Sequence, residues 1–186
     1  MTADRIAQDT IREIRCLIAL GSNLGDRLEN LHAGIDGLAA AEGVVVDAVS
    51  KLYETAPVGG PDEQGPYLNA ALVATTTLEA ADLLARMHRI EADRERERTV
   101  RWGPRTLDLD LLVYGDLVSD VPLLHVPHPR QHERRFVLVP VCDVAPDLVH
   151  PVLGRTMREL LAELPAEPGD LTAIADDWHH PQEVSS

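Results

Sequence analysis

Aromatic side chains are scarce in this chain: they make up 3% of the residues and include a single phenylalanine. Basic residues are also in short supply, because 17 lysines and arginines stand against 31 acidic residues, for a net charge of -14. General nucleic-acid binders need a basic face, and RNA-binding sheets stack bases on aromatic rings. The two shortages argue against a nucleic-acid-binding module.

Cysteine and long hydrophobic runs are lacking as well. Cys16 and Cys142 are the two cysteines, and they lie far apart in the chain. No apolar stretch approaches the roughly 20 residues that span a bilayer. The first one, at 16–20, is short and follows charged residues, which is unlike a signal peptide. We therefore expect a cytoplasmic protein with reduced thiols and no membrane association.

What the chain does contain is a regular alternation of strand-like and helix-like segments. Valine-rich or alternating stretches predict strands at 16–20, 44–56, 67–77 and 107–114. Apolar residues at spacings of three and four predict helices from Asp26 to before Gly43, at 78–94 and at 156–164. Residues 119–135 are predicted as a loop, and 136–142 as a short helix or strand interrupted by Pro140.

The order of these segments predicts an α+β fold. We expect a ferredoxin-like βαββαβ sandwich, with an antiparallel sheet and helices packed on one face. One domain would span residues 15–165. Residues 1–14 would form an N-terminal extension, and residues 166–186 a loose, acidic C-terminal tail.

Two aspartates on the last predicted strand carry the clearest chemical signal. Asp108 and Asp110 alternate with leucines, so on a strand both carboxylates point to one face, about 6.6 Å apart along the chain. Carboxylates at this separation suit a pair of magnesium ions in a phosphoryl-transfer site. Taken alone, the pattern equally describes an ordinary acidic face of a half-covered sheet.

Clustered arginines directly precede these aspartates. Arginine binds phosphate oxygens in a bidentate manner. The alternating Glu95 and Glu97 leave open a simpler interpretation, a solvated surface with ion pairs. A magnesium–triphosphate complex needs carboxylates on the metal and guanidinium groups on the free oxygens, which favours a nucleotide site. The arginines within this short stretch are Arg96, Arg98, Arg101 and Arg105.

Four segments together resemble the 6-hydroxymethyl-7,8-dihydropterin pyrophosphokinase family. They are Ala-Leu-Gly-Ser-Asn-Leu-Gly at 19–25, Tyr-Leu-Asn-Ala at 67–70, Arg-Trp-Gly-Pro-Arg-Thr-Leu-Asp-Leu-Asp at 101–110, and Val-Pro-His at 126–128. The resemblance runs from about residue 16 to about 151. It implies transfer of pyrophosphate from ATP to the hydroxymethyl group of the pterin, giving the pterin diphosphate and AMP in folate biosynthesis.

The resemblance also implies a role for individual residues. Asp108 and Asp110 would hold two Mg²⁺ ions, with ATP as co-substrate, and would act in catalysis with Arg96 and Arg105. The residues implied to contact the nucleotide are Glu91, Arg98, Leu111, His128 and Arg134. The residues implied to contact the pterin are Thr55, Pro57, Val58, Tyr67, Asn69, Trp102 and Phe136, with Tyr67 and Phe136 sandwiching the ring. Such an enzyme is expected to work as a monomer.

Two other interpretations are weaker. His125, His128 and His132 suggest zinc, but their spacing is loose, no cysteine joins them and prolines interrupt them. The pattern G-x-x-x-x-G-K-[ST] is absent from the sequence, so a P-loop kinase is excluded. A ferredoxin-like ligand-binding or regulatory module without catalysis explains the fold and a pocket, but not two aspartates beside clustered arginines.

Overall fold

An antiparallel sheet forms the centre of the computed structural model, which describes residues 12–56, 65–94, 106–166 and 169–179. The strands follow one another in space as β5-β1-β4-β3-β8, and β2 also pairs with β4. A separate hairpin joins β6 to β7. The strands are β1 Ile14–Ser22, β2 Val44–Val49, β3 Leu52–Thr55, β4 Tyr67–Thr76, β5 Asp108–Tyr114, β6 Ser119–Val121, β7 Leu124–Val126 and β8 Leu171–Ala175.

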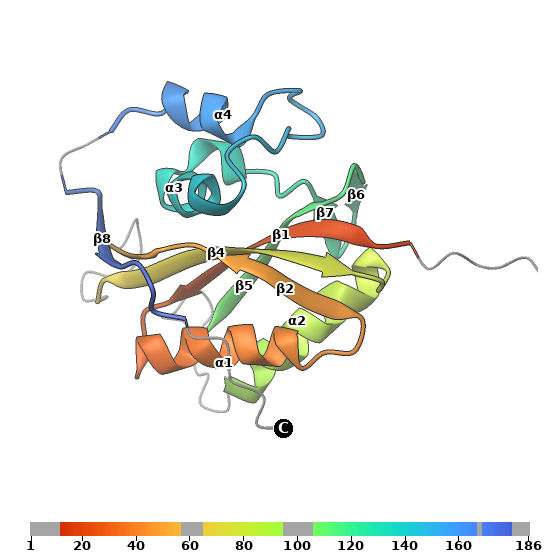
Figure 1. Cartoon of the computed structure of the whole chain (residues 1–186), viewed down its shortest axis with the longest axis horizontal. Coiled ribbons are helices and arrows are strands. Elements are labelled where there is room, and N and C mark those ends of the chain that lie inside the picture. Colours follow the sequence, from red (N-terminus) through yellow and green to blue (C-terminus); the bar gives the residue numbers. More distant parts are fainter. Residues whose placement is uncertain (1–11, 57–64, 95–105, 167–168, 180–186) are drawn as a thin grey trace, which may run out of the picture.

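Helices cover both faces of this sheet (Figure 1), so the prediction that they pack on one face is wrong. The helices α1 (Arg27–Ala39) and α2 (Ala80–Arg94) lie on one face. On the other face lie α3 (Arg135–Val144) and α4 (Met157–Glu163). The central strands are buried on both sides, with Ile18 in the α1–α2 core and Leu17 in the α3–α4 core. Such two-sided burial gives a continuous apolar run, as at residues 16–20, which indicates that both faces are covered but not which helices cover them.

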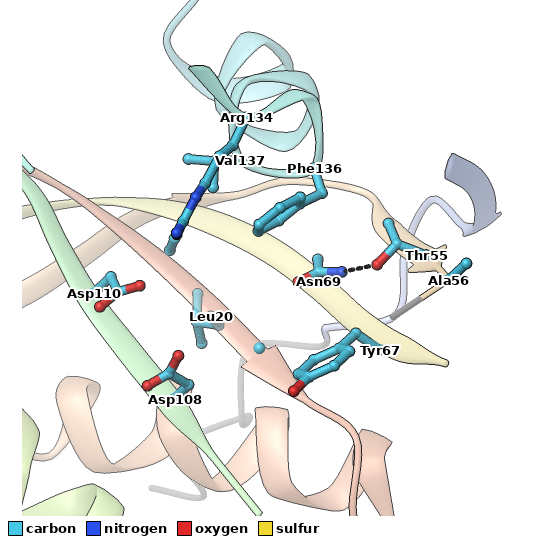
Figure 2. A pocket seen from close by; sticks show the side chains of 12 residues that line it. Leu20, Thr55, Ala56, Tyr67, Asn69, Asp108, Asp110, Arg134, Phe136 and Val137 are labelled. Carbon is cyan, nitrogen blue, oxygen red and sulfur yellow. Dashed lines mark hydrogen bonds between the residues drawn. The ribbon is translucent and has the colours of Figure 1, made fainter. Parts of the chain in front are cut away.

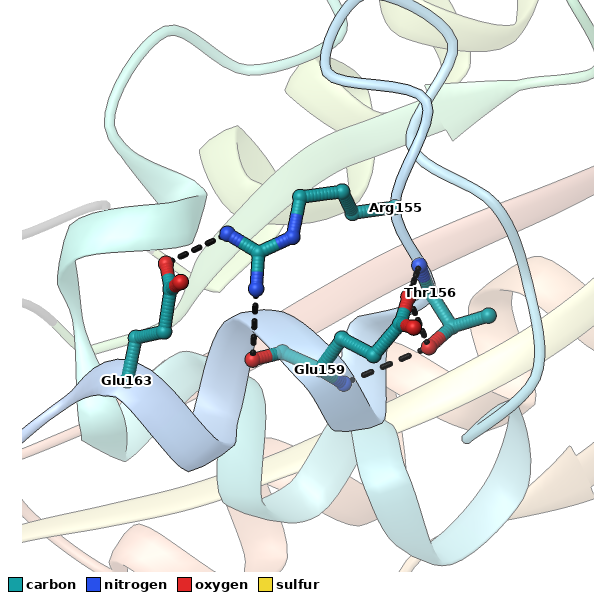
Figure 3. A network of polar contacts seen from close by, with 4 residues as sticks. All are labelled: Arg155, Thr156, Glu159 and Glu163. Carbon is teal, nitrogen blue, oxygen red and sulfur yellow. Dashed lines mark hydrogen bonds and ion pairs between the residues drawn. The ribbon is translucent and has the colours of Figure 1, made fainter.

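The two longest helices begin and end close to the predicted residues. The Asp26 carboxylate caps α1 by accepting a hydrogen bond from the Glu29 N–H, at 3.0 Å. This satisfies one of the N–H groups that a helix start leaves unpaired. The predicted helix at 156–164 is also confirmed, and its first turn carries a capping box between Thr156 and Glu159 (Figure 3). Arg155 pairs with Glu163 alongside it.

The predicted single strand at 44–56 is interrupted, and it forms β2 and β3 instead. Ser50 lies at the break, where its N–H donates to the Ala71 carbonyl at 2.8 Å. Its hydroxyl accepts from the Ala71 N–H at 2.9 Å and donates to the Lys51 carbonyl at 2.7 Å. A side chain that takes part in backbone pairing in this way bends the strand, which valine content alone does not indicate.

Two regions predicted to lack regular structure contain strands. The loop expected at 119–135 includes β6, β7 and a 3-10 turn at Gln131–Glu133. Three-residue strands are too short to show a two-residue periodicity. In the tail expected beyond Pro165, β8 pairs with β3. The following Trp178 is 8% exposed and donates from Nε1 to the Ser50 carbonyl at 2.8 Å.

Cys16 and Cys142 are free thiols, in agreement with the sequence prediction. Burial raises the pKa of Cys16 to about 12 and that of Cys142 to about 11, so both stay protonated near neutral pH. Within the described ranges, no helix combines the length and the apolar character that crossing a bilayer requires.

Candidate active site

Two rows of paired residues cross three neighbouring strands, β5, β1 and β4. In one row Asp108, Gly21 and Asn69 lie opposite one another, and in the next row Asp110 lies opposite Ala19. Residues directly opposite in a sheet point to the same face. Asp108 and Asn69 are therefore about 10 Å apart at their Cα atoms, with only the hydrogen side chain of Gly21 between them.

A cavity of about 230 Å³ lies above these rows (Figure 2). The carboxylates of Asp108 and Asp110 line one side of it, and Asn69, Thr55 and Tyr67 line the other. The small side chains between them leave the cavity open. A Cβ added at Gly21 would lie 3.5 Å from Oδ1 of Asn69, in van der Waals contact with it, and would take up part of this space. The cavity thus has an anionic end and a polar, aromatic end.

The polar end is formed by strands β3 and β4. Asn69 is 7% exposed and donates from Nδ2 to the Thr55 hydroxyl at 2.7 Å, and Thr55 is 5% exposed. This hydrogen bond fixes the amide orientation, so that Oδ1 is the atom available to accept. Buried polar groups in a fixed geometry select ligands with matching donors and acceptors.

Helix α3 supplies the roof of the cavity. Figure 2 shows Phe136 and Arg134 reaching from the start of α3 toward the sheet, with Tyr67 below Phe136 in the view. The Arg134 guanidinium carbon lies 5.6 Å from the centre of the Phe136 ring, within cation–π range. An aromatic ring on each side of a gap is suited to a flat heterocycle.

A second cavity of about 260 Å³ adjoins the first at Asp110. Asp110 lines both cavities, and Leu111 and His128 line the second. The carboxylate of Asp110 therefore lies at the boundary between two spaces, each large enough for part of a small molecule.

His128 faces the second cavity in a neutral form. Burial, helped by the positive charges of Arg134 and Arg130, lowers its pKa, although Asp108 opposes the shift. The Arg130 N–H donates to Nδ1 of His128 at 3.3 Å, so the proton of the neutral ring is on Nε2. His128 can therefore donate a hydrogen bond to an anion from Nε2.

Glu91 contacts the strand that carries the aspartates. Its Oε1 accepts a hydrogen bond from the Leu109 N–H at 2.7 Å. Leu109 stands between Asp108 and Asp110, so this contact fixes the backbone from which both carboxylates project. The predicted contact of Glu91 with the nucleotide stays a prediction.

The donor atoms of this site fit Mg²⁺. Magnesium binds oxygen ligands and typically takes one or two protein carboxylates, with waters and phosphates completing its shell. Asp108 and Asp110 offer that number of carboxylates on one face. In the described part of the chain, no three His, Cys, Asp or Glu side chains converge on a metal position, so the histidine cluster does not offer the four ligands of a structural zinc site.

Several predicted site residues lie outside the described residues, so their roles stay predictions: Pro57, Val58, Arg96, Arg98, Trp102 and Arg105. The others are brought together as described above. Further residues line the first cavity without having been predicted: Ala19, Gly21, Leu20, Ala56 and Val137. Alternating small residues next to Ser22 were the available signal for the first two, since small side chains at two-residue spacing leave space on one face of a strand.

A buried histidine between α3 and α4 should make stability depend on pH. His150 is 4% exposed and its Nδ1 accepts from the N–H groups of Val152 and Leu153, both at 3.2 Å. Burial, followed by the charge of the neighbouring His132, lowers its pKa from 6.5. The unfolded chain therefore binds this proton more readily than the folded chain, and stability falls as the pH drops below about 6.5.

We expect His150→Asn to weaken this pH dependence, because asparagine keeps a side-chain acceptor for the two N–H groups but does not titrate. Urea unfolding of both proteins at about pH 7.5 and about pH 5.5 measures the difference. The same loss of stability on acidification in both proteins would contradict this expectation.

Comparisons with known proteins show what the chain is similar to. Residues 17–146 match the family model of 7,8-dihydro-6-hydroxymethylpterin-pyrophosphokinase. The chain is 43% identical over 153 residues to the 2-amino-4-hydroxy-6-hydroxymethyldihydropteridine pyrophosphokinase of Pseudomonas aeruginosa, covering 82% of this chain and 93% of that protein. It is 45% identical over 151 residues to the protein of the same name from Methylorubrum extorquens, covering 81% and 93%.

Among solved structures, the chain resembles wild-type Plasmodium falciparum HPPK-DHPS with a TM-score of 0.63 and 15% identity. The similarity covers 82% of this chain and 43% of that one, so this chain spans less than half of the longer protein. At this identity the likeness shows the fold alone.

Proposed function

The chain belongs to the 7,8-dihydro-6-hydroxymethylpterin-pyrophosphokinase family, and on that premise we propose how its residues share the work of the reaction. The enzyme transfers pyrophosphate from ATP to the hydroxymethyl group of 6-hydroxymethyl-7,8-dihydropterin, in folate biosynthesis. The position of Asp110, which lines both cavities, carries the assignment of this site, because a two-substrate transfer needs the acceptor and the nucleotide to meet at one point.

The first cavity takes the pterin. Phe136 and Tyr67 hold the ring between them, and Asn69 and Thr55 bind its polar edge. The ring then lies at the end away from the aspartates. Because Asp108 and Asn69 are about 10 Å apart, the hydroxymethyl group of the ring reaches toward the carboxylates.

The second cavity takes part of the nucleotide. Leu111 lies beside it, and His128 donates from Nε2 to a phosphate oxygen. Arg134 adds positive charge from the roof, near the point where the two cavities meet. Arg96, Arg98 and Arg105 are proposed to bind further phosphate oxygens, and Trp102, Pro57 and Val58 to contact the pterin.

Asp108 and Asp110 would hold two Mg²⁺ ions, which neutralise the triphosphate when they are bound. The pterin hydroxyl oxygen attacks the β-phosphorus of ATP in line and loses its proton to water. The bond from that phosphorus to the oxygen that bridges the α- and β-phosphates breaks, and this oxygen leaves with AMP. The side chains of the chain position the two substrates, and the arginines and His128 stabilise the charge on the transferred group.

The same proposal covers the fold type and the bounds of the domain. The unit β1-α1-β2/β3-β4-α2-β5, with the strand order β5-β1-β4-β3, supports a ferredoxin-like arrangement to which α3, α4 and β8 are added. We propose that the pyrophosphokinase domain includes at least residues 15–165. That it works as a monomer in the cytoplasm stays a prediction.

Release of AMP tests the proposed function. The full chain is incubated with ATP and magnesium, with and without the reduced pterin, and AMP is quantified by chromatography. We expect AMP only when the pterin is present, because water is a poor substitute for a positioned hydroxyl. Binding of both ligands without AMP would instead support the non-catalytic module, and pterin-independent AMP would contradict the assigned acceptor.

A further inference from the structure

An ion pair joins two segments behind the roof of the pterin cavity. Arg135, the first residue of α3, donates from Nε to Oδ2 of Asp170 at 2.7 Å. The two side chains are 25% and 28% exposed, so the pair is partly shielded from water. Arg135 stands between Arg134 and Phe136, and both of these neighbours line the cavity.

Asp170 connects this helix to the opposite side of the same cavity. It directly precedes β8, whose first residue, Leu171, pairs with Thr55 on β3. Thr55 lines the cavity and accepts the hydrogen bond from Asn69. The contacts therefore run from Phe136 through the ion pair and β8 to Thr55, around the outside of the cavity.

The other attachments of these segments do not depend on the ion pair. The C-terminal part of α3 is tied to β3 by Asp143, whose Oδ2 accepts from the Tyr53 hydroxyl at 2.7 Å and from the Lys51 N–H at 3.2 Å. The far end of the C-terminal segment is held by Trp178, which bonds Ser50 and stacks on the His32 ring at 5.3 Å. Without the ion pair, the start of α3 should therefore become looser, while the rest of α3 and β8 stay in place.

We propose that Arg135 and Asp170 are positioning residues for the pterin. Their ion pair sets the separation of Phe136 from Thr55 and Asn69, and so the fit of the ring between them. The inference rests on the proposed function of this cavity. The second cavity is lined from α2, β5 and the segment at 123–128, so nucleotide binding is expected to depend on the pair less than pterin binding does, through the neighbouring Arg134.

The test compares Michaelis constants for the two substrates. In Arg135→Gln and Asp170→Asn, we expect KM for the pterin to rise about 3- to 10-fold, because an aromatic ring displaced by a fraction of an ångström loses stacking contact. KM for ATP and kcat should change clearly less than KM for the pterin, because most of the second cavity is lined by other elements. The exchanged double variant, Arg135→Asp with Asp170→Arg, should recover much of the pterin affinity because it restores the opposite charges.

A matched control is Arg158→Gln, which removes an arginine paired with Asp147 at 2.9 Å on the exposed side of α4. It should change neither Michaelis constant. Single variants with an unchanged KM for the pterin would overturn the inference. So would variants in which both Michaelis constants and the melting temperature shift together, since that pattern reports general loosening. Wild-type protein that releases no AMP would overturn the proposed function, and the inference with it.

Discussion

Asp108→Asn and Asp110→Asn should each lower the rate of AMP release by about a thousandfold or more. A neutral amide is a poor ligand for a divalent cation. Without the bound magnesium ions, most of the negative charge of the triphosphate would not be neutralised. Both carboxylates project from β5 onto the same face and are proposed to hold the ions together, so the loss of either one is expected to disrupt the site. Initial rates measured with saturating ATP and pterin check this expectation.

The fold should survive these two substitutions. Asp108 and Asp110 are partly exposed and the amide has nearly the same shape, so circular dichroism and the melting temperature should match the wild type. Asp116→Asn makes the same chemical change at an exposed position just after β5, away from both cavities, and should keep full activity. Near-normal turnover in either site variant would remove the two-metal proposal.

Phe136→Ala should reduce kcat/KM for the pterin by about 100-fold. The substitution removes one of the two rings proposed to enclose the substrate, and burying an aromatic face together with its stacking contribution is worth roughly 2–3 kcal/mol. It also removes the ring over which Arg134 lies, so that arginine loses a contact that orients it. Steady-state kinetics with the pterin varied at saturating ATP measure the loss.

Controls separate stacking from a general effect on α3. Phe136→Tyr keeps the ring and should retain most of the activity. Val139→Ala shortens a partly buried side chain of the same helix that does not line the first cavity, and should leave KM for the pterin unchanged. An equal loss in the alanine and tyrosine variants of Phe136 would mean that shape, not the ring face, controls binding.

The position of Asp108 and Asp110 on one face was predictable because it follows from strand geometry alone. The alignment of Asp108 with Gly21 and Asn69, and of Asp110 with Ala19, was not predictable, because register between strands depends on pairing across the whole sheet. Asn69 and Thr55 were both assigned to the pterin by family resemblance. The hydrogen bond between them, which leaves the Asn69 carbonyl oxygen as the acceptor, required the structure.

The second helical layer and the last strand were missed for a related reason. Leu17 and Ile18 are consecutive and both fully buried, yet the sequence does not say which elements bury them. Trp178 lies in an acidic, polar segment, and its burial depends on contacts with Ser50 and His32 more than 120 residues earlier. Such long-range contacts leave little trace in local composition.

Strand β8 has a consequence for how copies of this protein behave in concentrated solution. It covers the hydrogen-bonding edge of β3, which would otherwise present unpaired N–H and C=O groups as a template for another chain. The border that it creates is five residues long and flanked by Asp170, Asp176 and Asp177. A short sheet edge with charged residues at both ends disfavours pairing with a strand of a neighbouring molecule, so the same segment also guards against aggregation.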